Sequence, residues 1–450
     1  MSRLSVEDVR DLVRDDEVHR DVYISPDVFD LEMEHLWPSS WIFLGHDSQV
    51  PEAGDYVAVD IGREPLIMVR DRDGSINVVK NRCAHKGAKL VTAPAGKLGA
   101  TLRCPYHGWT YHYDGAFRSF PEPRGYDGTR IELKDENRLV LGLTRVENVA
   151  NYRGFVFVRL SEQGLGFEEF FGASLSSIDN MVDRAPQGRL EVAGGVLRYM
   201  HNCNWKMFVE NLNDTMHPMV AHHSSAGTAK ALWYAEHDAD EPKPMVVEQF
   251  EPFVGSYDFF DRMGVQIFER GHSYTGVHFS IHSNYSAIPG YFEALQQTLG
   301  EDKAREVLGT NRHNTVYYPS LTIKGAIQAI RIARPIAHDK TLIESWTFRL
   351  VGASDELLER TLMYSRIINA PTSVVGHDDL QCYRAIQEGL ASTGNDWISL
   401  HRGHDPREAK GIAGEYNGNN EVSMRGQYRA WRDLIVASME SRTRRPGGSS

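Results

Sequence analysis

Two short Cys/His motifs hold the residue types in this chain that are best suited to chemistry. Cys83-x-His85 is followed, eighteen residues later, by Cys104-x-x-His107. Each motif puts one thiolate and one imidazole on a short loop, and two facing loops can hold a [2Fe–2S] cluster with two Cys on one iron and two His on the other. A structural zinc ion also accepts two Cys and two His, although zinc sites usually open with Cys-x-x-Cys. The spacing therefore favours the cluster and leaves zinc as the alternative.

A second group of candidate metal ligands follows further along the chain. Glu210, Asp214 and His217 would share one face of a continuous helix. His217 and His222 are five residues apart, about 140° on an ideal helix, so they can meet at one metal only if the helix distorts near Pro218. Two imidazoles and one carboxylate form the ligand set of non-heme Fe(II) oxygenases. Hydrogen-bonded structural histidines are the alternative.

The carboxylate must come from another segment, and Asp378 and Asp379 are the best candidates. Adjacent acidic residues at a helix start usually serve only as favourable partners of the helix dipole. The residues alone therefore leave the choice between them open.

Composition excludes several classes of function. The 450 residues suffice for two or three domains, and their net charge of −12 argues against nucleic acid or an anionic membrane as partner. No run approaches the roughly twenty apolar residues of a membrane span. The N-terminus lacks the apolar region of a signal peptide and instead predicts a helix capped by Ser5 and Asp8. We expect Cys203 and Cys382 to be buried free thiols in a cytoplasmic protein.

The chain pattern predicts an α+β protein in two parts. Short β-rich runs and turns between about 55 and 159, including a hairpin turn at 71–74, predict a small antiparallel β domain with both Cys/His loops at hairpin tips. Helix and strand patterns mix after the glycine-containing segment 161–166, which predicts a larger α+β domain with an antiparallel sheet. We expect an N-terminal segment at 1–40, the β domain at 41–162, the α+β domain at 163–440 and a disordered tail at 441–450.

The motif residues resemble those of a known family. The two stretches Cys83-Ala84-His85-Lys86-Gly87-Ala88 and Cys104-Pro105-Tyr106-His107-Gly108-Trp109 are similar to the Rieske domain of the non-heme iron ring-hydroxylating oxygenases, specifically of the large (α) subunit. The similarity runs from about Tyr23 to the 430s and looks closest to the benzoate, anthranilate and salicylate group. It implies one Rieske [2Fe–2S] cluster and one mononuclear Fe(II) per chain, with residues 1–40 packed on the catalytic domain.

The resemblance also implies a role for each residue. Cys83, His85, Cys104 and His107 would hold the cluster. His217, His222 and Asp379 would hold the iron, because the family's carboxylate is the second member of such an acidic pair; Asp378 is the alternative. Asp214 would be catalytic, linking an iron ligand to a cluster histidine of a neighbouring subunit in a head-to-tail homotrimer, with or without a small β subunit. Asn211 and Leu212 would line the substrate pocket.

The expected function is that of a terminal oxygenase. The sequence carries no Gly-x-Gly-x-x-Gly after a strand and no other nicotinamide or flavin fingerprint, so NAD(P)H and flavin would act only through a partner reductase, with or without a ferredoxin. The resemblance implies O2-dependent hydroxylation or cis-dihydroxylation of an aromatic, carboxylated substrate. The alternatives are a Rieske monooxygenase acting on a non-aromatic or N-/O-methylated substrate, a Rieske electron carrier, and a zinc hydrolase using His217 and His222.

Overall fold

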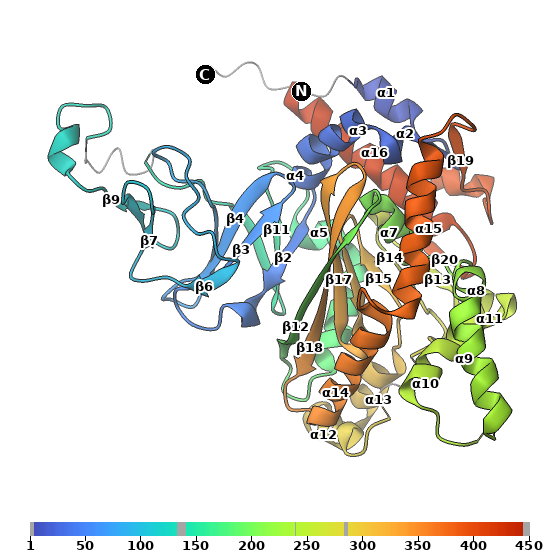
Figure 1. The fold of residues 1–450 in the computed structure, drawn as a ribbon. Helices are drawn as coiled ribbons and strands as arrows, with labels where there is room; N and C mark the ends of the chain where they lie inside the picture. Colours follow the sequence, from blue (N-terminus) through green and yellow to red (C-terminus); the bar gives the residue numbers. More distant parts are fainter. Residues whose placement is uncertain (1–3, 133–140, 239, 283–286, 444–450) are drawn as a thin grey trace. The chain divides into compact units, whose positions relative to one another are not determined.

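The computed structural model describes residues 4–132, 141–238, 240–282 and 287–443, and the chain divides into two compact units (Figure 1). One unit spans residues 37–164. The other combines the residues up to 36 with those from 165 onward. Among the described helices, none is both long and apolar enough to cross a bilayer.

The unit at 37–164 consists of small antiparallel sheets, as the sequence predicts. The Cys104/His107 loop lies at a hairpin tip between β7 and β8, but the Cys83/His85 loop joins β5 to β6, which are not neighbours in their sheet, so the prediction of two hairpin tips is wrong for the first loop. Their strand orders are β5-β4-β3-β6, β7-β8-β9 and β10-β11-β2. The predicted hairpin turn at 71–74 joins β4 to β5, where Gly74 adopts a positive φ of 87°. The bounds are β2 Ile42–His46, β3 Asp55–Ile61, β4 Glu64–Arg70, β5 Ile76–Lys80, β6 Ala95–Lys97, β7 Leu102–Arg103, β8 Thr110–Tyr111, β9 Phe117–Ser119, β10 Asn148–Tyr152 and β11 Phe155–Arg159, with a short α4 at Trp37–Ser39.

The larger unit is built on one antiparallel sheet of eight strands, in the order β12-β18-β17-β16-β15-β14-β13-β20. Its long strands β17 and β18 are mostly buried, which agrees with the Ile residues of β17 and the Leu, Ile, Trp and Phe residues of β18. A separate pair, β1 with β19, ties the N-terminal segment to a late part of the chain. The bounds are β1 Glu17–His19, β12 Leu190–His201, β13 Val265–Ile267, β14 Ser273–Thr275, β15 Thr315–Tyr317, β16 Leu321–Lys324, β17 Ala329–Ala337, β18 Lys340–Leu350, β19 Trp397–Ser399 and β20 Gly414–Tyr416.

Helices surround this sheet, and two of them matter for the site (Figure 1). Helix α7 packs against β17, and helix α15 packs against β12. The predicted α+β class is therefore confirmed. The bounds are α1 Val6–Asp11, α2 Asp21–Ile24, α3 Pro26–Leu31, α5 Phe167–Phe171, α6 Ser176–Asp183, α7 Trp205–Asn211, α8 Pro218–Ala221, α9 His223–Glu236, α10 Met245–Phe250, α11 Tyr257–Met263, α12 Tyr291–Leu299, α13 Glu301–Gly309, α14 Asp355–Tyr364, α15 Val374–Leu390 and α16 Val422–Thr443.

A buried carboxylate joins three distant segments of the larger unit. Glu32 is fully buried and accepts hydrogen bonds from Trp205 Nε1 (2.8 Å), Trp431 Nε1 (2.7 Å) and Lys206 Nζ (2.5 Å). These donors belong to α7 and α16. A buried charge is tolerated only when it is paired and hydrogen-bonded, and Glu32 meets both conditions. The N-terminal segment thus holds α7 and α16 in place.

The domain boundaries that the sequence predicts after residues 40, 162 and 440 remain predictions.

Three sequence expectations differ from the structure. Helix α7 ends at Asn211, so Glu210, Asp214 and His217 do not lie on one helix. Cys382 is exposed, because α15 buries the face that carries Tyr383 and leaves Cys382 on the solvent side. The first three residues of the predicted tail are helical, since Arg442 donates to Glu34 and anchors the end of α16, while 444–450 lie outside the described residues. The predicted Ser5–Asp8 cap is confirmed.

Glu210 points away from the candidate iron ligands and into a hydroxyl pair. The Tyr23 hydroxyl donates to it at 2.8 Å, and the Tyr428 hydroxyl donates to the same oxygen. Burial raises the pKa of Glu210 to about 7, although the two hydroxyl groups act in the opposite direction. The folded protein therefore holds this proton at pH values at which the unfolded chain has lost it.

We expect Glu210→Gln to flatten the pH dependence of stability. Because the pKa of Glu210 is higher in the folded protein than in the unfolded chain, protonated Glu210 adds to the free energy of unfolding. This contribution is complete below pH 4.5 and is lost as the pH rises through about 7. The loss amounts to roughly 3 kcal/mol. Urea midpoints at pH 5 and pH 8, followed by tryptophan fluorescence, should differ more for the wild type than for the variant. Glu168→Gln, on the exposed surface of α5, is the control. A Glu210→Gln protein with an unchanged pH profile would contradict this interpretation.

Candidate metal centres

The two Cys/His loops have the same backbone conformation. In the first, the Cys83 carbonyl accepts from the Gly87 amide (2.9 Å), and the Cys83 amide donates to the carbonyl of the residue after that glycine. In the second, the Cys104 carbonyl accepts from the Gly108 amide (3.1 Å), and the Cys104 amide donates in the same way. Both glycines have positive φ, 73° and 69°. A glycine four residues after each cysteine thus allows two differently spaced motifs to form matching loops.

The cluster candidates lie as two pairs, thiols with thiols and imidazoles with imidazoles. Cys83 and Cys104 are buried in the hydrophobic core of their unit, and the Tyr111 hydroxyl lies 3.1 Å from Cys83 Sγ. The rings of His85 and His107 are 4.6 Å apart. His85 also stacks on Trp109, and its Nδ1 is buried with no hydrogen-bond partner among the described residues.

This arrangement fits a two-iron cluster better than a single zinc ion. Zinc holds its ligands at 2.0–2.3 Å, which brings all four ligand atoms within about 4 Å of one another. In the described part of the chain, three ligand atoms come within 4.8 Å of one another only at His217, His222 and Asp379. A [2Fe–2S] cluster keeps its thiolate end apart from its imidazole end, and the unpartnered His85 Nδ1 suits a ligand atom.

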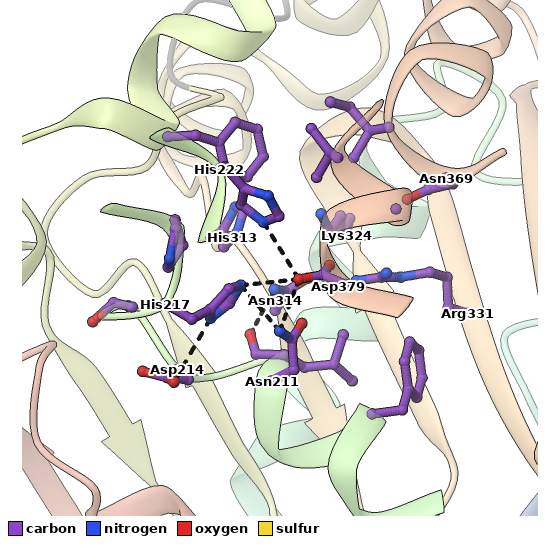
Figure 2. A pocket seen from close by; sticks show the side chains of 18 of the residues that line it. Asn211, Asp214, His217, His222, His313, Asn314, Lys324, Arg331, Asn369 and Asp379 are labelled. Atoms are coloured by element: carbon purple, nitrogen blue, oxygen red, sulfur yellow. Dashed lines mark hydrogen bonds and ion pairs between the residues drawn. The ribbon is translucent and has the colours of Figure 1, made fainter. Parts of the chain in front are cut away.

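His217, His222 and Asp379 converge at one point (Figure 2). Asp379 Oδ1 lies 3.6 Å from His217 Nε2 and 3.4 Å from His222 Nε2. The Asn211 side-chain amide donates to His217 Nε2 (3.0 Å) and to Asp379 Oδ1 (3.3 Å). Two imidazole nitrogens and one carboxylate oxygen therefore face a shared space, which is the donor set of a mononuclear non-heme iron site.

The two histidines flank a short helix that follows a break in the chain. Helix α7 ends at Asn211, and α8 starts at Pro218, directly after His217. His222 follows α8 and precedes α9, with φ −93° and ψ 4°. Helix α8 therefore occupies the interval between the two imidazoles as a single helical turn, and the chain departs from helical geometry at His222. The distortion that the sequence predicted near Pro218 is not found at that residue, which is the first of α8; the non-helical stretch, 212–217, lies on its N-terminal side.

Each imidazole has an acidic partner at its other ring nitrogen. His222 Nδ1 lies 3.2 Å from Asp378 Oδ2, and His217 Nδ1 lies 3.7 Å from Asp214 Oδ2. Ser225 also donates to Asp378 (2.9 Å). A carboxylate that faces Nδ1 favours the proton there and leaves Nε2 free to bind a metal. The two neighbouring acids therefore have different partners. Asp379 faces the Nε2 atoms of both histidines, and Asp378 faces Nδ1 of His222.

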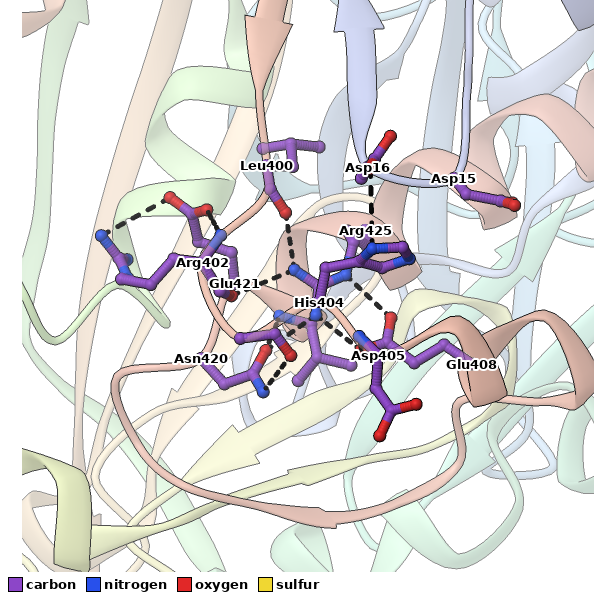
Figure 3. A network of polar contacts seen from close by, with 12 residues as sticks. Asp15, Asp16, Leu400, Arg402, His404, Asp405, Glu408, Asn420, Glu421 and Arg425 are labelled. Atoms are coloured by element: carbon purple, nitrogen blue, oxygen red, sulfur yellow. Dashed lines mark hydrogen bonds and ion pairs between the residues drawn. The ribbon is translucent and has the colours of Figure 1, made fainter.

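Asp214 accepts a hydrogen bond from Arg402. Arg402 belongs to a network of polar contacts (Figure 3). Arg402 donates to Asp214 Oδ1 at 3.3 Å and to the carbonyl of Asn419 at 2.6 Å. The segment that carries Arg402 is anchored by Arg425, which is buried and donates two hydrogen bonds to Glu408 at 2.8 and 2.7 Å. Bidentate pairs of this kind are strong and directional. The network fixes the position of a carboxylate that the sequence identified only by its spacing.

The charges at the site follow from these contacts. Burial would raise the pKa of Asp214, but His217 and Arg402 outweigh it, and the net shift is downward. Burial would likewise lower the pKa of His217, but the carboxylates of Asp214 and Asp379 raise it. Burial lowers the pKa of His201 to about 3 and moves that of His313 well below its usual range. Both of these histidines are therefore neutral at pH 7.

A pocket opens beside the three converging residues. With its open mouth, it holds about 880 Å³ not filled by protein atoms. Asn211 and Leu212 line it, and so do two cations that sequence reasoning missed, Lys324 and Arg331. Lys324 ends the short buried strand β16, and Arg331 lies in β17, which is apolar apart from Arg331 and Arg334; a cation within such a run is the signal that could have revealed them. The apolar part of the lining includes Phe208, Phe253, Phe260, Met263, Ile281, Ile368 and Leu380.

Comparisons with known proteins agree with this geometry. Residues 40–138 match the Rieske [2Fe-2S] domain family, and residues 190–437 match the ring hydroxylating alpha subunit (catalytic domain) family. The chain is 31% identical to the toluate 1,2-dioxygenase subunit alpha of Pseudomonas putida, over 89% of this chain and 86% of that one. It is 31% identical to the anthranilate 1,2-dioxygenase large subunit of Acinetobacter baylyi, over 86% and 80%.

Solved structures show the same fold. A naphthalene 1,2-dioxygenase with indole bound superposes with a TM-score of 0.75 at 21% identity, covering 95% of this chain and 94% of that one. The two matched families together imply one Rieske cluster and one mononuclear iron. The family match covers more than half of the chain, and the relatives align over most of it. The protein is therefore a member of the ring-hydroxylating oxygenase α subunits, an enzyme that oxidises aromatic rings with O2.

Proposed function

We propose that His217, His222 and Asp379 hold the mononuclear iron and that Cys83, His85, Cys104 and His107 hold the cluster. The observation that carries this proposal is the convergence of two Nε2 atoms and one carboxylate oxygen at the wall of a pocket. An iron bound there would activate O2 beside the substrate, with electrons supplied through the cluster. Asp378 and Asp214 would keep the imidazole protons on the nitrogens that face away from the metal.

The proposed substrate is an aromatic carboxylic acid. The relatives named above act, by their names, on toluate and anthranilate, and another, 30% identical, on 2-halobenzoate. Apolar side chains, together with Asn211 and Leu212, would hold the ring, and the product would be a cis-dihydrodiol or a hydroxylated acid. Hydroxylation of a non-aromatic substrate, or demethylation, is the alternative within the same chemistry.

We further propose the partners and the assembly. The enzyme would receive electrons from NAD(P)H through a flavin-containing reductase, with or without a ferredoxin. It would form a head-to-tail homotrimer in the cytoplasm, alone or with a small β subunit. Heterologous contacts of this kind close into rings. In such a ring Asp214 would bridge His217 and a cluster histidine of the neighbouring copy, which gives this carboxylate a role in electron transfer.

The test of function is product analysis after reconstitution. The purified protein, a compatible reductase and NADH are incubated under ¹⁸O2 with benzoate, anthranilate, salicylate and toluates, and with naphthalene as a neutral aromatic compound. We expect ¹⁸O in a diol or hydroxylated product of at least one acid. Labelled product only from N- or O-methylated or non-aromatic compounds would support the alternative, and no labelled product from any compound would refute an oxygenase.

A pair of variants tests the iron ligands. Asp379→Ala removes the oxygen that faces both Nε2 atoms, so we expect loss of mononuclear iron while the red-brown cluster remains. Asp378→Ala removes only the partner of His222 Nδ1, and loss of such a partner weakens metal binding by about 10- to 100-fold. Iron per chain at limiting Fe(II), measured alongside the cluster absorbance, separates the two. Greater iron loss in Asp378→Ala than in Asp379→Ala would reverse the assignment.

Asp214→Asn tests the electron-transfer role. The amide is isosteric but uncharged, so both metal centres should remain while turnover falls by about 10- to 100-fold. The measurement is single-turnover oxidation of the pre-reduced cluster in the presence of substrate and O2. Arg402→Gln is a useful comparison, because it removes the partner of Asp214 and retains the carboxylate. Cluster oxidation at the wild-type rate in Asp214→Asn, or a fully active monomer by light scattering, would exclude the bridge.

A further inference from the structure

Two cations share one face of the central sheet beside the candidate iron site. In the register of β16 with β17, Lys324 lies opposite Ala329, and Arg331 lies opposite Thr322. Paired residues project to the same face, and so do residues two apart on a strand, which puts Lys324 and Arg331 on one face as diagonal neighbours. Diagonal neighbours are about 7–8 Å apart at their backbones, close enough for two long side chains to reach one small group.

Neither cation has an acidic partner. In the described part of the chain, no carboxylate oxygen lies within 4.0 Å of Lys324 Nζ or of the Arg331 guanidinium. Lys324 is only 5% exposed, and its ammonium group meets the Tyr364 hydroxyl at 3.1 Å. Arg331 packs over the ring of Phe208 at 5.1 Å, and its Nε is buried without a hydrogen-bond partner. Several hydrogen-bond donors therefore remain available on a buried ammonium group and a half-buried guanidinium.

Three other buried cations of this unit have an acidic partner, while the fully buried Arg184 donates to carbonyl and amide oxygens of 307–311. Lys206 is paired with Glu32, Arg334 with Glu344 at 3.2 Å, and Arg425 with Glu408 at 2.7 Å. Burying a charge without a partner costs several kcal/mol, and like charges at neighbouring sheet positions add to that cost. A pair of uncompensated cations that both line a pocket therefore points to a ligand that brings the missing negative charge.

This pair and the candidate iron ligands line the same pocket. Lys324 and Arg331 enter it from the sheet on the side of Asp379, while His217 and His222 enter from the opposite segment (Figure 2). Burial and the nearby Arg331 lower the pKa of Lys324 well below its usual range, whereas Asp379 acts in the opposite direction. A second anion beside Lys324 would further stabilise its ammonium form. The lining histidines His201 and His313 are neutral and cannot take over this role.

We propose that Lys324 and Arg331 bind the carboxylate of an aromatic acid substrate and so orient its ring toward His217, His222 and Asp379. The inference rests on the proposed function, because it assumes that the substrate enters this pocket. To the proposed function, the inference adds that Lys324 and Arg331 select aromatic acids over neutral aromatic compounds. The planar guanidinium can donate two parallel hydrogen bonds to a carboxylate, and the ammonium can add a third.

The experiment measures binding without turnover. The full-length protein, loaded with both metal centres and kept anaerobic without reductase, is titrated calorimetrically with three matched pairs: benzoate and benzamide, anthranilate and 2-aminobenzamide, salicylate and salicylamide. Each amide keeps the shape of its acid and loses the charge. We expect the wild type to bind at least one acid about tenfold or more tightly than its amide, a difference of ~1.4 kcal/mol.

Variants identify the residues responsible. Lys324→Met and Arg331→Met should each weaken binding of that acid by about tenfold or more, since one partner of a desolvated charge pair is lost. Binding of the amide should stay within about threefold. Arg331→Lys keeps the charge but not the planar fork and should fall between the wild type and Arg331→Met. Arg312→Met is the matched control, because Arg312 stacks on Tyr274 and does not line the pocket. Iron content and circular dichroism check that each variant is folded and loaded.

The outcomes separate this inference from the proposed function. It is overturned if no acid binds more tightly than its amide, if the Met variants keep the acid preference, or if they weaken acid and amide equally. Loss of iron in the Met variants without a change in acid preference would instead assign the cations to charge balance at Asp379. Acid-selective binding that depends on both cations, in a protein that forms no oxygenated product, would support the inference and refute the function.

Discussion

The candidate iron site depends on the end of one helix. Helix α7 ends at Asn211, and the non-helical stretch that follows leads to His217, which precedes the short helix α8. His217 and His222 flank α8, and their Nε2 atoms lie 3.6 and 3.4 Å from Asp379 Oδ1 on α15. The break needs rigid surroundings, and they are supplied by α7 packed on β17 and by the Glu32 hydrogen bonds that join α7 to α16.

Charged side chains surround His217 and His222 in a regular order. The Nε2 atoms face one carboxylate, Asp379, while the Nδ1 atoms face two others, Asp378 and Asp214. Asp214 is in turn compensated by Arg402. A divalent cation bound at the centre would complete an alternation of opposite charges from the metal outward. Such an arrangement holds imidazole rings in one tautomer and one orientation, which a flexible helix break could not do by itself.

The same unit uses buried charge in two distinct ways. At Glu32 and at Arg425 each charge meets its partner within the chain, and the contact ties together segments far apart in sequence. At Lys324 and Arg331 the partner is missing from the described residues, and the two side chains face a pocket. The first arrangement stabilises the fold. The second lowers stability unless a ligand supplies the counter-charge, as is typical of binding sites.

The sequence by itself determined the local features. The spacing of Cys83, His85, Cys104 and His107 indicated a cluster, alternating β-rich runs indicated the small antiparallel domain, and the Ser5–Asp8 cap and the 71–74 turn were predicted and are confirmed. These features can be predicted from sequence because their causes lie within a few residues: loop geometry, hydrogen-bonding caps and the two-residue period of a strand. The α+β class followed from the same local patterns.

Tertiary structure decided whatever depends on residues distant in sequence. Spacing could not separate Asp378 from Asp379, because neighbouring residues differ only in the direction that the packed helix gives them. Helix propensity could not reveal the end of α7 at Asn211, which the packing of the surrounding segments imposes. Nor could the sequence tell that Lys324 and Arg331 have no acidic partner among the described residues, since a cation in a strand looks the same whether or not a carboxylate lies across the sheet. Pairing is a property of three-dimensional neighbours, and only the folded chain defines them.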